Sequence, residues 1–275
     1  RPLLPAIRRN GKSSGAAPDG APAAAASIVG RRNRACIRSG MAKEAGMAMS
    51  GTECGQIDVH TCRFPLPRTH TGILMRNAVL GAMVWGEGSV LRITLNRADL
   101  WDHRGGLRWN EQIRYEELRR SLEKGDEEDL RRRFYHTPAP GSPARPTRLP
   151  LGRFDLDFGS GAEIRCGVLN FTTGRVDIYV RRGGSEAVVY LYLPMDRPVL
   201  LVEAPPELLP AVTPVPAWKY VEKDLSAVGY VPPEVFRSEN RAGWVQPCPA
   251  DPPVAAAALW TNREIVCAVV LGKDG

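Results

Sequence analysis

The sequence lacks the features of several common protein classes. It holds no apolar run long enough to cross a membrane as a helix, and we expect no membrane partner. Its six cysteines include no CxxC pair, and no histidine stands at ligand spacing from them, so we expect no metal site. Phosphate loops and nucleophile elbows are missing too, and we expect no cofactor. The function must therefore be inferred from other patterns.

Net charge is small outside the first part of the chain. The formal net charge is +7 over 275 residues, but residues 1–56 alone hold 9 Lys or Arg against 3 acidic residues. The remaining 219 residues hold 28 against 27. A nucleic-acid-binding surface on this larger part has no support from its charge, and we expect no nucleic-acid partner for it.

Residues 1–56 are rich in Ala, Gly, Ser, Pro and Arg and show no periodic apolar pattern. We predict that they form a disordered basic tail. The arginines between positions 31 and 38 could bind phosphate or belong to a targeting peptide. However, the tail has no interleaved aromatic residues, so nucleic-acid binding is the weakest functional hypothesis. Free cysteines favour a reducing compartment, the cytoplasm rather than secretion.

Residues 57–275 are dominated by strand patterns. Residues 57–64 alternate well enough for a first strand, and Leu91, Ile93 and Leu95 alternate with polar residues. From Leu151 onward, successive apolar segments separated by turns predict an antiparallel meander, which ends in a buried hairpin at 254–271. So many strands need a second sheet to cover their apolar face. The pattern predicts a mostly β fold, a large two-sheet antiparallel β-sandwich (a supersandwich).

A short helical insertion and several proline-rich segments interrupt the strands. Tyr115, Leu118 and Leu122 share one face of a helix that Asn110 can cap, and Asp126 can cap a second helix. The charged run 127–133 predicts a solvated helix face. Prolines predict a surface loop at 138–150, a connection at 205–216 and irregular chain between 232 and 253. We assign no structure to the segment that begins at Trp218.

Two carboxylates on one predicted strand invite a catalytic interpretation. Asp155 and Asp157 are spaced like a pair for acid and base chemistry. On a strand, however, they lie on the face opposite Phe154, Leu156 and Phe158. We therefore predict that both side chains are solvated and not catalytic.

The densest information lies in residues 72–104. Residues 80–86 read LGAMVWG, and residues 91–101 read LRITLNRADLW. These two segments resemble the N-terminal β-sandwich domain that precedes the (α/α)6 catalytic barrel in α-L-fucosidase-like glycoside hydrolases. The resemblance covers roughly residues 57–275. Family members usually begin the motif with Gly-Asn-Gly, where this chain has Arg76-Asn77-Ala78, and so lacks two residues that tolerate positive φ.

The resemblance implies a non-catalytic role for this chain. In such enzymes the groups that cleave the O-glycosidic bond of the carbohydrate lie in the barrel. No barrel sequence is present, so we assign no catalytic residue and expect this chain alone to be inactive. The chain stops four residues after a predicted buried strand. This ending predicts a truncated product, whose partner would be the barrel domain in cis.

The loop from Asn96 to His103 is the best candidate for a site near substrate. It combines the amide of Asn96, the carboxylates of Asp99 and Asp102 and the indole of Trp101, which suit hydrogen bonding to sugar hydroxyls and stacking on a sugar ring. The functional hypothesis is that this loop faces the barrel and borders its sugar pocket. In the structural alternative, Trp101 plugs the end of the sandwich while Asp99 and Asn96 cap local backbone.

A second function of a different class is a free-standing carbohydrate-binding β-sandwich. Such a module needs an exposed aromatic platform. Of the six tryptophans, only Trp101 and Trp109 lie in evidently polar loops.

Overall fold

The computed structural model of the chain describes residues 58–106, 114–134 and 140–272. The predicted tail at 1–56, together with Trp109 and Asn110, lies outside these residues. The described strands form two large sheets and one small one, and all of their pairings are antiparallel. The predicted class, a mostly β sandwich with a short helical insertion, is confirmed.

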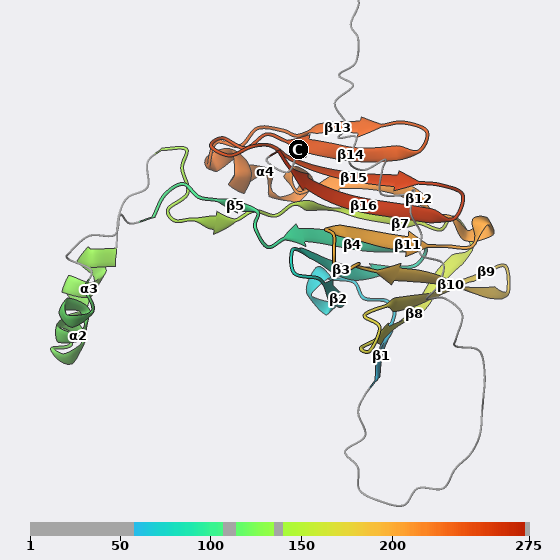
Figure 1. Cartoon of the computed structure of the whole chain (residues 1–275), viewed down its shortest axis with the longest axis horizontal. Helices are drawn as coiled ribbons and strands as arrows, with labels where there is room; N and C mark the ends of the chain where they lie inside the picture. Colours follow the sequence, from blue (N-terminus) through green and yellow to red (C-terminus); the bar gives the residue numbers. More distant parts are fainter. Residues whose placement is uncertain (1–57, 107–113, 135–139, 273–275) are drawn as a thin grey trace, which may run out of the picture. The chain divides into compact units, whose positions relative to one another are not determined.

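The strand order in the two large sheets can be followed in Figure 1. The nine-stranded sheet runs β1 (Val59–Arg63), β8 (Ala162–Asn170), β9 (Val176–Arg182), β10 (Ser185–Tyr192), β11 (Val199–Glu203), β16 (Glu264–Leu271), β15 (Val254–Trp260), β14 (Arg241–Gln246), β13 (Glu234–Arg237). The five-stranded sheet runs β12 (Ala211–Pro216), β7 (Gly152–Asp157), β4 (Val90–Arg97), β3 (Leu80–Glu87), β2 (Ile73–Arg76). The small sheet pairs β5 (Trp101–Asp102) with β6 (Thr147–Arg148).

One hydrophobic core joins the inner faces of the two large sheets. Leu91, Ile93 and Leu95 of β4 are 0% exposed and belong to the same buried cluster as Ile178 and Cys267 of the nine-stranded sheet. Successive residues of a strand point to opposite faces, so the alternation in β4 buries its apolar residues and leaves Arg92, Thr94 and Asn96 on the outer face. The predicted first strand, the meander β8–β11 and the hairpin β15–β16 are confirmed.

The carboxylates Asp155 and Asp157 lie on β7, which pairs with β4 and β12 and not with the meander that follows it. Phe154 and Leu156 alternate with them and are 0% exposed. Asp155 is bound by Nε of Arg153 at 2.8 Å, and Asp157 accepts a hydrogen bond from Ser89 at 2.8 Å. The predicted outward face of these carboxylates is confirmed.

Several segments that the prolines predicted to be irregular are strands instead. β12 covers the second half of the predicted connection 205–216, β13 and β14 lie within 232–253, and β6 lies within the predicted loop 138–150. β12 and β13 are edge strands, where a residue without an N–H removes no interior hydrogen bond, and Pro214 and Pro216 stand in β12. In this fold the prolines in β12 and those just before β13 therefore coincide with the edges of the sheets. The segment left without assignment begins the helix α4 (Trp218–Ala227), and two short 3₁₀ turns cover Thr69–Thr71 and Pro206–Leu208.

The turn between β2 and β3 forms without the flanking glycines. The Oδ1 atom of Asn77 accepts hydrogen bonds from the backbone N–H of Val79 at 2.9 Å and of Leu80 at 2.7 Å. Its amide nitrogen donates to the carbonyls of Pro194 and Arg197, which lie between β10 and β11 of the nine-stranded sheet. The side chain of Asn77 thus closes the turn and ties it to the β10–β11 connection.

The helical insertion consists of α2 (Tyr115–Glu123) and α3 (Glu127–Phe134), as predicted. The Oδ1 atom of Asp126 accepts a hydrogen bond from the N–H of Asp129 at 2.9 Å, so the predicted cap of α3 is present. Helix α2 begins one residue after Arg114, and the predicted capping residue Asn110 lies outside the described residues.

The charged run 127–133 was predicted to be a solvated helix face, but one of its residues, Asp129, is buried. Asp129 is 8% exposed and accepts hydrogen bonds from Ser121 Oγ at 2.6 Å and from Arg133 Nε at 2.6 Å. These hydrogen bonds, first that of Arg133 and then that of Ser121, hold the pKa of Asp129 well below its usual range. The carboxylate therefore fastens α3 to α2, and this pair of helices is joined by polar contacts.

Cys267 offers a test of whether this chain folds with a closed core. Its side chain is 0% exposed on β16, and burial raises its pKa to about 12. Because the thiolate is the reactive species, we expect Cys267 to resist iodoacetamide at pH 8 in the native chain and to react fully in 8 M urea. Peptide mapping by mass spectrometry measures this protection. Equal labelling of Cys267 with and without urea would contradict the closed core.

Candidate functional site

The candidate loop begins where β4 leaves the core. Arg97 continues the inward alternation of Leu91, Ile93 and Leu95 and is only 5% exposed. Its guanidinium donates to both carboxylate oxygens of Asp99, each at 2.8 Å, and to the carbonyl of Val269 on β16 at 2.9 Å. A buried arginine needs such partners. Asp99 therefore neutralises Arg97, while Arg97 ties the end of β4 to the opposite sheet.

Trp101 lies on β5 with part of its ring exposed. Its Nε1 atom donates to the carbonyl of Ala98 at 2.9 Å. Arg148, its cross-strand partner on β6, places its guanidinium carbon 6.0 Å from the ring centroid. The indole is thus held by a local hydrogen bond and a cation–π contact.

Asp102 is the most deeply buried carboxylate of the loop, at 1% exposure. It accepts hydrogen bonds from Arg104 Nη2 at 2.7 Å, from Arg104 Nε at 3.0 Å and from the Arg104 backbone N–H at 3.0 Å. The hydroxyl of Tyr230, 128 residues later in the chain, donates to it at 3.1 Å. A carboxylate with four such donors is fully satisfied.

Arg104 extends this network to two further segments. Its Nη1 atom donates to the carbonyl of Gly141 at 2.9 Å, and its Nη2 atom donates to the carbonyl of Val228, just after α4, at 2.6 Å. The guanidinium carbon also lies 5.8 Å from the ring centroid of Tyr230. Arg104 therefore holds together the end of β5, the loop at Gly141 and the segment after α4.

The charges of this network are fixed at neutral pH. Burial by itself raises the pKa of Asp102, but the hydrogen bonds and the charge of Arg104 outweigh it, so this pKa lies below its ordinary value. Burial, with the nearby Asp102 carboxylate, raises the pKa of Tyr230 above its ordinary value. Asp102 is thus a carboxylate and Tyr230 a neutral phenol. Neither is poised to exchange a proton near pH 7, so this geometry supports positioning and not acid or base catalysis.

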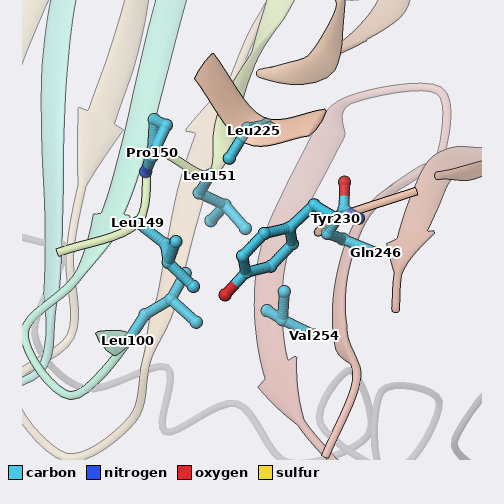
Figure 2. A pocket seen from close by; sticks show the side chains of 8 residues that line it. All are labelled: Leu100, Leu149, Pro150, Leu151, Leu225, Tyr230, Gln246 and Val254. Carbon is cyan, nitrogen blue, oxygen red and sulfur yellow. The ribbon is translucent and has the colours of Figure 1, made fainter. Parts of the chain in front are cut away.

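A small pocket lies beside the network. Figure 2 shows the Tyr230 ring among the apolar side chains that line it. The lining residues are Leu100, Leu149, Pro150, Leu151, Leu225, Tyr230, Gln246 and Val254. Its volume is about 10 Å³, which is room for about one water molecule. A sugar ring does not fit in this pocket.

The four predicted residues lie in two places. Asp99, Trp101 and Asp102 follow β4 at the same end of the sandwich, whereas Asn96 lies on the outer face of β4 opposite Gly81 of β3. The charges also differ in access: the Asp99 side chain is 39% exposed, and that of Asp102 is 2% exposed. Asp102 is thus the one of the four that a ligand outside the sandwich cannot touch, whereas Asn96, Asp99 and Trp101 are partly exposed.

The sequence interpretation missed Arg97, Arg104, Arg148 and Tyr230. For the first two a local signal existed. Arg97 and Asp99, and likewise Asp102 and Arg104, are oppositely charged residues only two positions apart in the chain, which is close enough for their side chains to pair. The same spacing forms the ion pairs of Arg153 with Asp155 and of Arg175 with Asp177. No local signal exists for Tyr230 or Arg148, because their partners are distant in sequence.

The fold and the loop define a class of protein, the antiparallel two-sheet β-sandwich with a positioned loop at one end. In a comparison with known protein families no family model matches the chain, and no curated protein matches it either. Within the described ranges, no three His, Cys, Asp or Glu side chains are grouped so that they could hold a metal ion. Helices in the described part of the chain are all too short or too polar to cross a membrane.

Proposed function

We propose that this chain is the N-terminal, non-catalytic β-sandwich part of a glycoside hydrolase that acts on O-glycosidic bonds of a carbohydrate. One observation carries the proposal. The segments 80–86 and 91–101, which resemble the family motif, fall on β3, on β4 and on the connection to β5, within a two-sheet antiparallel sandwich. The partner would be an (α/α)6 barrel in cis that supplies the catalytic carboxylates. Fold and motif support this assignment by analogy.

The geometry of the loop supports a role in bordering a sugar pocket. Trp101 has an accessible ring, and the adjacent Asp102 is fixed by Arg104 and Tyr230. A preorganised indole next to a rigid anchor loses little entropy when it stacks on a sugar. Asp102 remains ionised and buried, so it contributes no acid to the reaction. This arrangement fits a domain that shapes the pocket of another domain.

The coding sequence beyond Gly275 gives the first test. If the reading frame continues into a helical barrel with paired acidic residues, the proposal is supported, and the enzyme for the next test is defined. If a stop codon follows Gly275 directly, the barrel in cis does not exist and this proposal fails.

In the enzyme that carries the barrel, Trp101→Ala is expected to lower kcat/KM about tenfold, because a lost stacking contact is worth about 1.4 kcal/mol. Initial-rate kinetics and a thermal melt measure efficiency and stability separately. Phe171→Ala, which removes an exposed aromatic ring that belongs to neither candidate site, is the matched control and should leave kcat/KM unchanged. Unchanged efficiency together with lost stability in Trp101→Ala would leave only a structural role for the indole.

The alternative, a free-standing carbohydrate-binding module, rests on a different observation. Tyr220 on α4 is 48% exposed, and the guanidinium carbon of Arg153 lies 5.7 Å from its ring centroid and 5.5 Å from that of Trp85. Stacked aromatic and guanidinium groups of this kind could receive a sugar face. Binding of soluble glycans by the chain alone, lost in Tyr220→Ala, would favour this alternative over a domain that works only with a barrel.

A further inference from the structure

The central strands of the nine-stranded sheet are apolar on both faces. β11 reads VLLVE, β15 reads VAAAALW and β16 reads EIVCAVVL. A strand with one solvated face alternates between apolar and polar residues, whereas a strand covered on both faces reads as a continuous apolar run. The inner face of these strands is covered by the core. The sequence therefore indicates that their outer face is covered as well.

The register of the strands identifies the outer residues. Leu200, Cys267 and Ala258 are aligned across β11, β16 and β15, are 0% exposed and point inward. Their chain neighbours point outward and form a surface without a charged residue. We call this surface the apolar face; it consists of Val199, Leu201, Ala255, Ala257, Leu259, Val266, Ala268, Val270, Gly243 and Val245.

The other half of the same sheet surface is built differently. On β8 and β9 the outward positions include charged residues that pair with one another, such as Arg175 with Asp177 at 2.6 Å and Glu163 with Arg165 at 2.9 Å. Such pairs are typical of a solvated sheet face. The uncharged surface is thus confined to the strands β11, β16, β15 and β14, where Glu203, Glu264 and Arg241 stand at its rim.

The size of the apolar face suits a weak protein interface. Four strands spaced by about 4.8 Å and three rows of side chains spaced by about 6.8 Å span roughly 300–400 Å² of sheet. Val199, Ala268 and Gly243 of the central row are buried within one copy, so the open part consists of the other, partly exposed residues of the apolar face. A contiguous apolar patch of this size on a monomer is often functional. With its rim included, it corresponds to an interface at the low end of specific contacts, below about 1,200 Å² in total.

The charges at its rim point to a second copy as the occupant. Arg241 on β14 continues the row of Leu201, Val266 and Leu259, whereas Glu203 on β11 stands one row beyond Leu201. Among the residues that the structure describes, Arg241 is exposed and has no ion-pair partner. A two-fold axis along the strands, between β16 and β15, would place β14 of one copy over β11 of the other. Each Arg241 would then approach the Glu203 of the other copy, and both contacts would form at once.

We infer that the chain forms a two-fold dimer in which the apolar faces of two copies pack together, with Arg241 of each copy beside Glu203 of the other. This inference goes beyond the proposed function and does not depend on it, because the loop from Asn96 to His103 lies outside the apolar face. Sheets packed face to face lie about 10 Å apart, and the rim side chains are long enough to meet across that gap.

Sedimentation velocity of the chain 1–275 tests the dimer. We expect a monomer–dimer equilibrium with a dissociation constant on the order of 10 μM. Val266→Lys, on the central strand β16 of the apolar face, should leave a monomer at all concentrations. Val168→Lys, on the charged half of the same sheet surface, is the matched control and should leave the equilibrium unchanged. A thermal melt checks that each variant is folded.

A charge exchange makes the test specific for this dimer. Arg241→Glu should weaken association by about tenfold, and the double variant Arg241→Glu/Glu203→Arg should restore it, since the exchanged charges attract again. Both substitutions are at the surface and do not disturb the core. A chain that stays monomeric at 200 μM would overturn the inference and leave the apolar face to another partner. Association into species larger than a dimer, with the same strength in the wild-type chain and in both charge variants, would overturn it as well.

Discussion

Trp244→Ala is expected to lower the free energy of unfolding by about 4 kcal/mol, the largest loss for a single side chain that we predict for this fold. Trp244 points inward from β14, is 0% exposed and packs its ring 5.1 Å from that of Phe154 on β7. A Cβ atom at Gly152 would lie 2.6 Å from Cζ2 of the indole, so the ring rests directly on the backbone of β7. The cavity left by alanine spans both sheets and cannot collapse easily.

Trp244→Phe is the control that separates volume from chemistry. The Nε1 atom of Trp244 is buried and has no hydrogen-bond partner among the residues that the structure describes. Phenylalanine removes this donor, whose burial costs about 1–3 kcal/mol, and keeps most of the ring. We therefore expect a loss of about 1 kcal/mol or less. Urea unfolding followed by far-UV circular dichroism measures both variants. Equal losses for alanine and phenylalanine would contradict a packing role for the ring.

The core could be predicted from sequence because its signal is local. Leu91, Ile93 and Leu95 repeat with the period of two that a half-buried strand requires, and all three are 0% exposed in the core. Strands β12 and β13 were missed because proline is a general signal against strands. Pro214 stands in a strand that pairs on one side only, so its missing N–H costs no ladder hydrogen bond. Edge position is a tertiary property, and no local pattern contains it.

The candidate site was predictable only in part, for the same reason. Asp99, Trp101 and Asp102 were found because polar and aromatic residues break the alternation after β4. Tyr230, which donates to Asp102, lies 128 residues away from it, and Val269, whose carbonyl accepts from Arg97, lies 172 residues away from Arg97. One sequence gives no information about such pairs. Thus the sequence pointed to the loop. The structure shows that Asp102 anchors this loop through Arg104 and Tyr230, and that Trp101 is an accessible side chain of the loop.

Asp102→Asn is expected to lower the free energy of unfolding by about 3 kcal/mol, because it leaves the guanidinium of Arg104 partly buried without its carboxylate. Tyr230→Phe removes one hydrogen bond to the same carboxylate and should cost about 1 kcal/mol. Asp196→Asn is the matched control. Asp196 also pairs with an arginine, Arg197, at 2.7 Å, but both side chains are exposed, and we expect no measurable change.

The effect of pH follows from the direction of the shift. The pKa of Asp102 is lower in the folded chain than in the unfolded chain, where it is about 3.9. The unfolded state therefore binds the proton more readily, and the stability from Asp102 is present above about pH 4 and is lost as pH falls through the folded pKa. The gap between the wild-type chain and Asp102→Asn should be constant from pH 5 to pH 7 and should narrow below about pH 4. Urea titrations across this range measure the gap, and a gap that widens in acid would refute the assignment.

The same variant separates anchoring from contact. Asp102 binds Arg104, and Arg104 holds the carbonyls of Gly141 and Val228, so its loss should loosen the segments around Trp101 as well as destabilise the fold. Trp101→Ala removes the accessible ring but leaves this network in place. If the loop borders a sugar pocket, Asp102→Asn should lower both stability and kcat/KM, whereas Trp101→Ala should lower kcat/KM alone. If the loop only closes the end of the sandwich, both variants should lower stability, and neither should change kcat/KM of the folded enzyme.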